Sequence, residues 1–443
     1  MKSRFSILLS LIVSLGLLIP IQVSAQQQNS ATTFRGNDQH TGVYNASGPE
    51  KFNQVKWKFK TAGKIFSSPS IANGVVYFGS NDSCLYAVDA VTGKQKWKFK
   101  TSGVVSSSPA IHDGKVFFVS FDGNLYALNA KTGSKIWSFN GGPEKLFTAP
   151  GIHGLQPKTQ MMVDPWDMYL SSPVVENGVV FFGSGAGVFY AIDSKTGKKK
   201  WDFKAAGVIH SSPITCEGMV VFGDWGGKLH ALDMITGKEK WLFQAGIDTV
   251  NYNQVGFQSS PAYSKGVIYT GCRDANVYAI DAMTGVLKWK YFNNYSWVIC
   301  SPAVSDDVIY FGTSDTHRLI GLKATTGEVI FNTNLQAFVF ASPSIAGNQL
   351  YVGDFSGSLF AINKKTGTVD WKFTTESAKE NKLNVLSDKG EIRDEVFKDC
   401  NTYNAMVNVM DVLYSVGSIL SSPVIEKGVV YFGSTDGYLY AIQ

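Results

Sequence analysis

Short apolar runs separated by polar turns recur along the whole chain, and they predict β-strands. In Val75-Val76-Tyr77-Phe78, for example, β-branched and aromatic residues follow one another without alternation. Such runs are typical of strands that are covered on both faces. Each run belongs to a longer unit that reads Ser-Ser-Pro, glycine, apolar run, polar turn, Leu-Tyr-Ala, Thr-Gly and Trp-x-Phe. We therefore expect four short antiparallel strands in every unit.

The unit occurs eight times, and each copy carries one proline. Adjacent prolines are 40 or 41 residues apart in several places, as from Pro69 to Pro109 and from Pro261 to Pro302. This period is typical of one four-stranded blade of a β-propeller. The eight prolines are Pro69, Pro109, Pro173, Pro213, Pro261, Pro302, Pro343 and Pro423.

The two ends of the chain complete one unit between them. The last unit stops at Gln443, before its own Trp-x-Phe strand, while a strand of that type at Lys56–Phe59 precedes the first full unit. Joining the two leaves no unpaired sheet edge. We therefore predict an all-β fold, a single eight-bladed β-propeller of four-stranded antiparallel blades over residues 51–443, closed by the N-terminal strand. Residues 26–50 are expected to form an N-terminal extension.

One tryptophan column follows the Thr-Gly turn of the units at a fixed distance. It contains Trp97, Trp137, Trp201, Trp241, Trp289 and Trp371, with Phe331 in the sixth unit. Large rings at one repeat position favour packing between adjacent blades over a ligand cage.

Two insertions, at about 140–168 and 374–418, interrupt the repeat. Both lie between the outermost strand of one blade and the innermost strand of the next. Because strand direction alternates within a blade, both insertions are expected on one rim. Glu391 to Val412 is predicted to be partly helical, with apolar residues among charges, and we interpret the second insertion as a lid or docking element.

The first residues indicate export. Lys2 and Arg4 precede an apolar stretch from Ile7 to Ile19, and Val23-Ser24-Ala25 has the small residues of a cleavage site. We expect residues 1–25 to be a cleaved signal peptide, which predicts a periplasmic or secreted protein with no transmembrane anchor after processing. The formal charge of +5 includes Lys2 and Arg4, so the mature chain carries +3. This charge does not suggest a nucleic-acid partner.

The five cysteines are Cys84, Cys216, Cys272, Cys300 and Cys400, with neither a disulfide framework nor zinc spacing.

The Ser-Ser-Pro, Tyr-Phe-Gly-Ser, Leu-Tyr-Ala and Thr-Gly-x-x-x-Trp elements together resemble the PQQ-type repeat. That repeat is shared by quinoprotein alcohol dehydrogenases and BamB-like outer-membrane assembly proteins. The resemblance covers nearly the whole mature chain and implies the propeller fold, whereas function resides in sites placed on the fold. Dehydrogenases of this type carry a disulfide between neighbouring cysteines, and this sequence has no such pair. The resemblance implies PQQ with calcium only as an alternative, and we expect no cofactor.

Departures from the repeat mark the candidate site, because every other blade shows what a position holds when it serves only the fold. The polar and aromatic departures concentrate in blades four and five. Such a mixture suits a polar or carbohydrate ligand at the channel mouth. In the alternative interpretation, His210 only hydrogen-bonds a rim turn. The catalytic candidates are His210, Arg273 and Asp224, and the ligand-binding candidates are Trp225, Gln258, Asp274, Asp354, Phe355, Phe121 and His153.

Three functions follow as hypotheses. The first is an extracytoplasmic, BamB-like scaffold that binds an envelope protein partner or a small polar or carbohydrate ligand at the rim. The second is a PQQ-dependent alcohol or sugar dehydrogenase, and the third is a carbohydrate-active lyase or hydrolase. We favour the first, a protein that is not an enzyme, because the repeat residues are structural and the sequence holds no recognisable catalytic motif.

Overall fold

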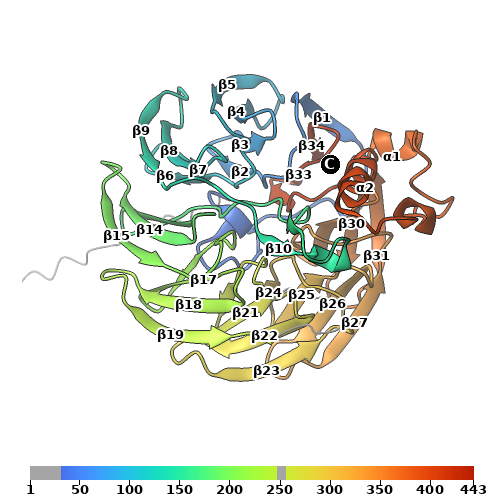
Figure 1. The fold of residues 1–443 in the computed structure, drawn as a ribbon. Coiled ribbons are helices and arrows are strands. Elements are labelled where there is room, and N and C mark those ends of the chain that lie inside the picture. Colours follow the sequence, from blue (N-terminus) through green and yellow to red (C-terminus); the bar gives the residue numbers. More distant parts are fainter. Residues whose placement is uncertain (1–30, 247–255) are drawn as a thin grey trace, which may run out of the picture.

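Eight four-stranded antiparallel sheets are arranged in a ring around a central axis, which confirms the predicted propeller (Figure 1). The computed structural model describes residues 31–246 and 256–443. The predicted signal peptide therefore lies outside the described residues. Within these residues, no helix has the length and apolar character needed to span a bilayer.

The blades are numbered along the chain, each from its innermost to its outermost strand. The first four are blade 1, β2 (Ser70–Ala72), β3 (Val75–Ser80), β4 (Cys84–Asp89) and β5 (Gln95–Lys100); blade 2, β6 (Ala110–His112), β7 (Lys115–Val119), β8 (Asn124–Asn129) and β9 (Lys135–Asn140); blade 3, β12 (Val174–Glu176), β13 (Val179–Gly183), β14 (Val188–Asp193) and β15 (Lys199–Lys204); and blade 4, β16 (Ile214–Cys216), β17 (Met219–Gly223), β18 (Lys228–Asp233) and β19 (Glu239–Gln244).

The other four are blade 5, β20 (Ala262–Ser264), β21 (Val267–Gly271), β22 (Asn276–Asp281) and β23 (Leu287–Phe292); blade 6, β24 (Ala303–Ser305), β25 (Val308–Gly312), β26 (Arg318–Lys323) and β27 (Val329–Asn334); blade 7, β28 (Ser344–Ala346), β29 (Gln349–Gly353), β30 (Ser358–Asn363) and β31 (Val369–Thr374); and blade 8, β32 (Val424–Glu426), β33 (Val429–Gly433), β34 (Tyr438–Ile442) and β1 (Val55–Lys60).

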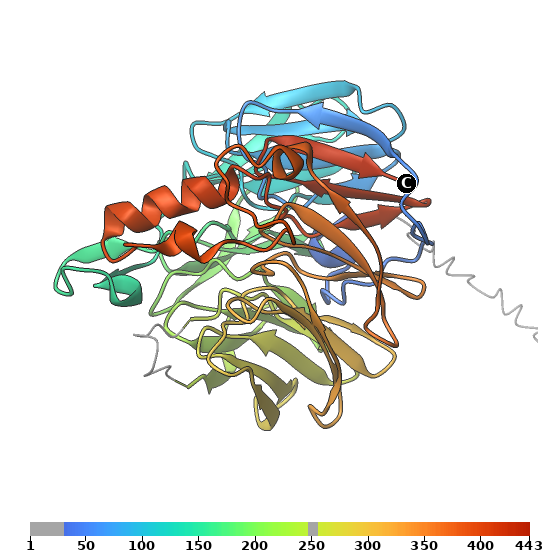
Figure 2. The ribbon, with the colours of Figure 1, turned by 90° about the vertical axis from the view of Figure 1, so that its right-hand side faces the viewer.

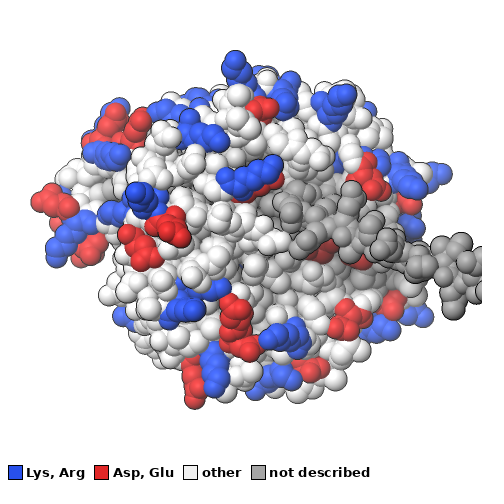
Figure 3. Space-filling model, turned by 180° about the vertical axis from the view of Figure 1, so that it is seen from behind, with Lys and Arg blue, Asp and Glu red and all other residues white. Residues whose placement is uncertain are grey.

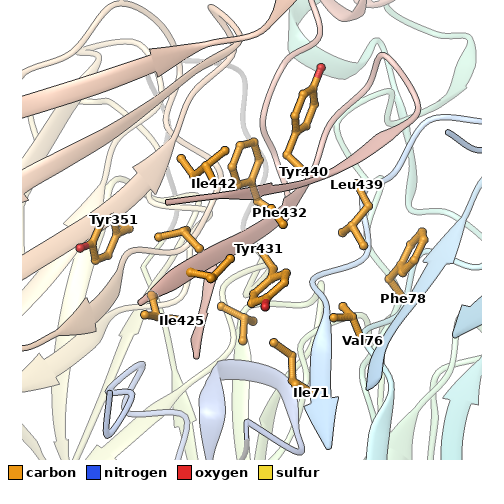
Figure 4. Close-up of a cluster of buried hydrophobic side chains, with 14 of the residues drawn as sticks. Ile71, Val76, Phe78, Tyr351, Ile425, Tyr431, Phe432, Leu439, Tyr440 and Ile442 are labelled. Carbon is orange, nitrogen blue, oxygen red and sulfur yellow. The ribbon is translucent and has the colours of Figure 1, made fainter. Parts of the chain in front are cut away.

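Blade 8 joins the two ends of the chain. Strand β1 pairs antiparallel with β34, from Val55 opposite Ile442 to Lys60 opposite Tyr438. Its sheet packs against blades 1 and 7 through a buried cluster that includes Phe78, Tyr351, Phe432 and Leu439 (Figure 4). The predicted closure by the N-terminal strand is therefore confirmed.

In every blade, the serine directly before the repeat proline closes the ring from inside. Its hydroxyl oxygen accepts a hydrogen bond from the backbone N–H of the equivalent serine in the preceding blade, at 2.8–3.2 Å. Eight such bonds form an unbroken circle, since Ser422 of blade 8 donates to Ser68 of blade 1. Each bond satisfies a buried backbone group that has no strand partner, which explains why the motif repeats.

The tryptophan column links adjacent blades on the outside, as predicted. Each indole N–H donates to a backbone carbonyl of the following blade, and Trp201, for example, lies 3.1 Å from the Met234 oxygen. The glycine of the Thr-Gly turn lets the ring approach: a Cβ on Gly237, where φ is +70°, would lie 2.7 Å from Trp201. Trp371 instead donates to the Pro49 carbonyl, because blade 8 has no Thr-Gly turn.

The segment 31–48 crosses one mouth of the channel and includes the short helix η1 (Phe34–Gly36). Its carbonyl groups accept hydrogen bonds from the innermost strands of six blades, as from Ile71 to Ala31 and from Ile345 to Gly42, both at 2.8 Å. This part of the predicted extension is therefore integrated with the propeller. Seen from this side, basic and acidic side chains alternate across the surface (Figure 3).

Both insertions lie at the other mouth. The first, residues 141–169, contains β10 (Thr148–Pro150), η2 (Ile152–Gly154) and β11 (Met161–Val163), and the second, residues 375–417, contains α1 (Glu376–Glu380), η3 (Asp394–Phe397) and α2 (Tyr403–Tyr414). Helix α2 overlaps the stretch predicted to be partly helical and ends two residues beyond it. The insertions contact each other, since Gln156 donates its N–H to the Asn401 carbonyl at 2.8 Å. We call the two insertions together the cap, and Figure 2 shows the cap projecting from one side of the propeller.

Candidate functional site

The column of residues before the Ser-Ser-Pro units lines the channel. Its apolar members, among them Leu170, Ile299 and Phe340, fill most of the space, and His210 and Gln258 of blades 4 and 5 complete the wall. The cavity that remains has a volume of about 40 Å³. This volume accommodates about three water molecules.

His210 lies at the inner end of blade 4, between two carboxylates of the cap. Its Nδ1 is 2.7 Å from Asp167 Oδ1, and its Nε2 is 3.3 Å from Glu144 Oε1. The side chains of His210 and Asp167 are fully buried, and that of Glu144 is 1% exposed. Burial alone would lower the pKa of His210, but the two carboxylates outweigh it and raise that pKa to about 10. His210 is therefore a buried cation at neutral pH.

Arg273 of blade 5 forms the second buried ion pair. Its guanidinium lies 2.5 Å from Asp164 Oδ2 and also donates to the Gln258 side-chain oxygen at 2.7 and 3.0 Å. The rings of Trp225 and Trp297 cover its faces, with centroids 4.4 and 4.6 Å from the guanidinium carbon. Burial opposes ionisation of Asp164, but Arg273, His153 and the Trp166 backbone N–H together outweigh it, so the pKa of Asp164 is lowered.

These contacts attach the first insertion to the propeller. Asp164 also lies 3.0 Å from His153 Nε2, and Gln258 donates its side-chain N–H to the Trp166 carbonyl at 2.6 Å. The cap thus supplies the acidic partners, and blades 4 and 5 supply His210 and Arg273. The departures at His210, Gln258 and Arg273 are explained by the anchoring of the cap.

The sequence prediction brought together five residues that meet here: His210, Arg273, Gln258, Trp225 and His153. It missed the anchoring role of Asp164 and Asp167, and it did not consider Glu144. Charge could have indicated this pairing. The first insertion carries three acidic residues that pair with the histidine and the arginine of blades 4 and 5.

Asp224 and Asp274 take no part in this cluster. Asp224 accepts a hydrogen bond from the Lys228 backbone at 2.9 Å and lies 3.3 Å from His230 Nε2. Asp274 accepts hydrogen bonds from the Tyr278 hydroxyl and from the Asn276 backbone. Both side chains therefore brace the turns of their own blades.

Asp354, Phe355 and Phe121 lie elsewhere under the cap. Asp354 is fully buried, and burial raises its pKa to about 6 although Ser356 donates to it. Phe355 is also fully buried and packs edge-on against Trp166 in the core between cap and propeller. Phe121 is partly exposed and lines a hollow of about 310 Å³ between blades 1 and 2 and the cap.

A larger pocket opens beside the cap, with a volume of about 530 Å³. It lies where both insertions meet the loop between blades 5 and 6. Six ring-bearing side chains line it: His153, Trp166, Tyr295, Trp297, Phe338 and Phe397. Of the sequence-predicted site residues, only His153 lines this pocket.

The channel does not fit the quinone cofactor that such propellers suggest. PQQ is a fused three-ring quinone, far larger than the cavity of about 40 Å³ left between the apolar side chains. Over the described residues, no group of three or more His, Cys, Asp or Glu side chains is placed to bind a metal ion. All five cysteines are unpaired thiols, so a disulfide that would pack on a quinone is also absent from the described chain.

Comparison with known proteins gives a family and a fold. A family model described as outer membrane protein assembly factor BamB matches residues 42–164, 157–296 and 295–397. No curated protein sequence matches. Among solved structures, BamB from Moraxella catarrhalis is 15% identical, with a TM-score of 0.64 over 88% of this chain and 99% of that one. Quinohemoprotein alcohol dehydrogenase from Comamonas testosteroni is 14% identical, with a TM-score of 0.69 over 95% and 81%.

Proposed function

The chain belongs to the PQQ-repeat propeller family described as outer membrane protein assembly factor BamB, and from this premise we propose that it is an extracytoplasmic binding scaffold. Its capped face holds a protein partner or ligand. The observation that carries the proposal is the use of the irregular residues: His210, Arg273 and Gln258 anchor a cap instead of facing a substrate.

Burial argues against catalysis by these groups. A general acid or base must come within hydrogen-bonding reach of its substrate. The side chains of His210 and Arg273 are 0% exposed, and each is already held by carboxylates of the cap. The lyase or hydrolase hypothesis would therefore require the cap to leave the propeller, and the dehydrogenase hypothesis would require a channel that this chain fills with side chains.

The capped face offers apolar surface for a partner. Met161 of the first insertion is 61% exposed and Leu383 of the second is 59% exposed. Exposed apolar side chains on such a face are common in protein–protein interfaces. The opposite rim provides matched positions, since Met283 is 61% exposed and Val286 is 62% exposed in the turn between β22 and β23.

Site-specific photo-crosslinking in the native host tests this proposal. A photoreactive amino acid is placed at Met161 or Leu383, and in separate strains at Met283 or Val286. We expect discrete crosslinked adducts of the exported protein from the first two positions and none from the second two. Adducts of equal yield from both rims, or from neither, would contradict a scaffold that binds a protein partner through its capped face.

A further inference from the structure

We propose that the pocket of about 530 Å³ beside the cap binds a neutral carbohydrate, one or two sugar units in size. The proposal rests on the binding function proposed above and names a ligand class for the same face. Small-molecule sites typically combine this size with aromatic walls and a few convergent polar groups.

The aromatic walls come from four separate parts of the chain. Trp166 belongs to the first insertion, Phe397 to the second, Trp297 to the loop between blades 5 and 6, and Phe338 to the loop between blades 6 and 7. Ring faces are electron-rich, so they attract the C–H groups on the apolar face of a sugar ring. The pocket is also held in shape, because Trp166 contacts Phe338 edge-on with centroids 5.8 Å apart.

The polar groups of the pocket are suited to ligand hydroxyls. Asp315 contributes a carboxylate, Asn294 an amide, and Ser296 and Ser314 hydroxyls. His153, whose Nε2 lies 3.0 Å from Asp164, adds an imidazole ring to these groups. A polyol can donate to such acceptors through several hydroxyl groups.

Charge excludes anionic sugars and disfavours organic cations. The described residues that line the pocket include no lysine or arginine, whereas Asp315 would repel a carboxylate or phosphate. Trp297 would be the natural platform for a cation, but Arg273 already lies 4.6 Å from its ring centroid. A ligand cation at the same ring would be repelled by the Arg273 guanidinium, which offsets the attraction of the ring.

Ligand-observed NMR on the purified, processed protein provides the test. The probes are glucose, galactose, N-acetylglucosamine and maltose, with glucuronate and choline as charged probes. We expect saturation transfer to the ring C–H protons of at least one neutral sugar, and none to glucuronate or choline. Transfer to choline alone, to glucuronate, or to no probe would overturn the proposal.

Two variants then locate the site. Asp315 and Tyr295 are exposed at the pocket, so Asp315→Ala and Tyr295→Ala should leave the fold intact. We expect each to weaken sugar binding about tenfold, the cost of losing one hydrogen bond to a charged group or one stacked ring. Asp307→Ala, an exposed aspartate on the other rim, is the matched control and should leave the affinity unchanged.

Unchanged sugar affinity in both pocket variants would also overturn the proposal. The result is separable from the scaffold proposal, because crosslinking at Met161 and Leu383 reports partner contact whether or not the pocket takes a sugar. Sugar binding without crosslinks contradicts only the protein-partner form of the scaffold proposal, and crosslinks without sugar binding contradict only the carbohydrate site.

Discussion

Replacing His210 with glutamine removes the cation that lies between the buried carboxylates of Glu144 and Asp167. Glutamine is sterically acceptable at this column, since Gln258 occupies the equivalent position of blade 5. Glu144 and Asp167 would then face each other without a counter-ion. A histidine pKa held at about 10 instead of 6.5 corresponds to about 5 kcal/mol of favourable interaction, and breaking a buried ion pair typically costs 3–5 kcal/mol. We therefore expect His210→Gln to lower the free energy of unfolding by about 4 kcal/mol.

The pH dependence has a definite sign. The pKa of His210 is raised in the folded state, so its stabilising contribution is fully present below about pH 6.5 and is lost as pH rises through about 10. Denaturant unfolding of the wild type and His210→Gln should therefore differ most near pH 6 and converge as the pH approaches 10. Glu144→Gln is the matched variant, because it keeps the His210–Asp167 pair. Its side-chain oxygen can also accept the hydrogen bond that the Gly185 N–H donates to Glu144 at 2.8 Å.

We expect Glu144→Gln to cost about 1 kcal/mol, much less than His210→Gln. The reasoning would be refuted if the two variants lost equal stability. It would also be refuted if the difference between wild type and His210→Gln grew from pH 6 to pH 10.

The repeat makes two further predictions, and the N-terminal sequence makes a third. Gly237→Ala should lower the free energy of unfolding by about 3 kcal/mol, because the new Cβ meets Trp201. Gly218 also has a positive φ but nothing within 4 Å of its Cβ position, so Gly218→Ala should cost only about 1 kcal/mol. Thermal unfolding compares the two variants, and equal losses of stability would count against tight packing at the Gly237 turn. Ser212→Ala breaks one bond of the serine circle and leaves a buried N–H without an acceptor, so we expect about 2 kcal/mol in denaturant unfolding; a loss below about 0.5 kcal/mol would mean that water replaces the hydroxyl. Mass spectrometry of the protein recovered from its native host should find a chain beginning directly after Ala25, and an intact N-terminus would disprove cleavage there.

The sequence predicted the propeller because a blade is a local unit. The residues of one blade that pair lie within about forty positions, as from Ser70 to Trp97, and the same interactions recur around the ring. Even the long-range closure of β1 on β34 was predictable, because each end of the chain carries the part of the unit that the other lacks.

The site was predictable only in part. His210 and Arg273 stand out because other blades hold different residues at their positions, but their partners lie 43 and 109 positions away in a segment without periodicity. Without the path of that segment, an isolated histidine and arginine at a channel mouth resemble a ligand site. Once Asp167 and Asp164 are placed, the same residues form buried ion pairs that attach the cap.

Hydrogen–deuterium exchange of the first insertion tests most directly whether the cap is a fixed part of the propeller. The N–H of Asp164 donates to the Phe147 carbonyl at 2.8 Å, and that of Trp166 to the Asp164 carboxylate at 2.9 Å, both beside the buried ion pairs. We predict that peptides covering 161–168 exchange as slowly as the inner strands of the wild-type blades and become fast in His210→Gln, while the strands remain protected. Fast exchange of these peptides in the wild-type protein, or unchanged exchange in the variant, would contradict an anchored cap.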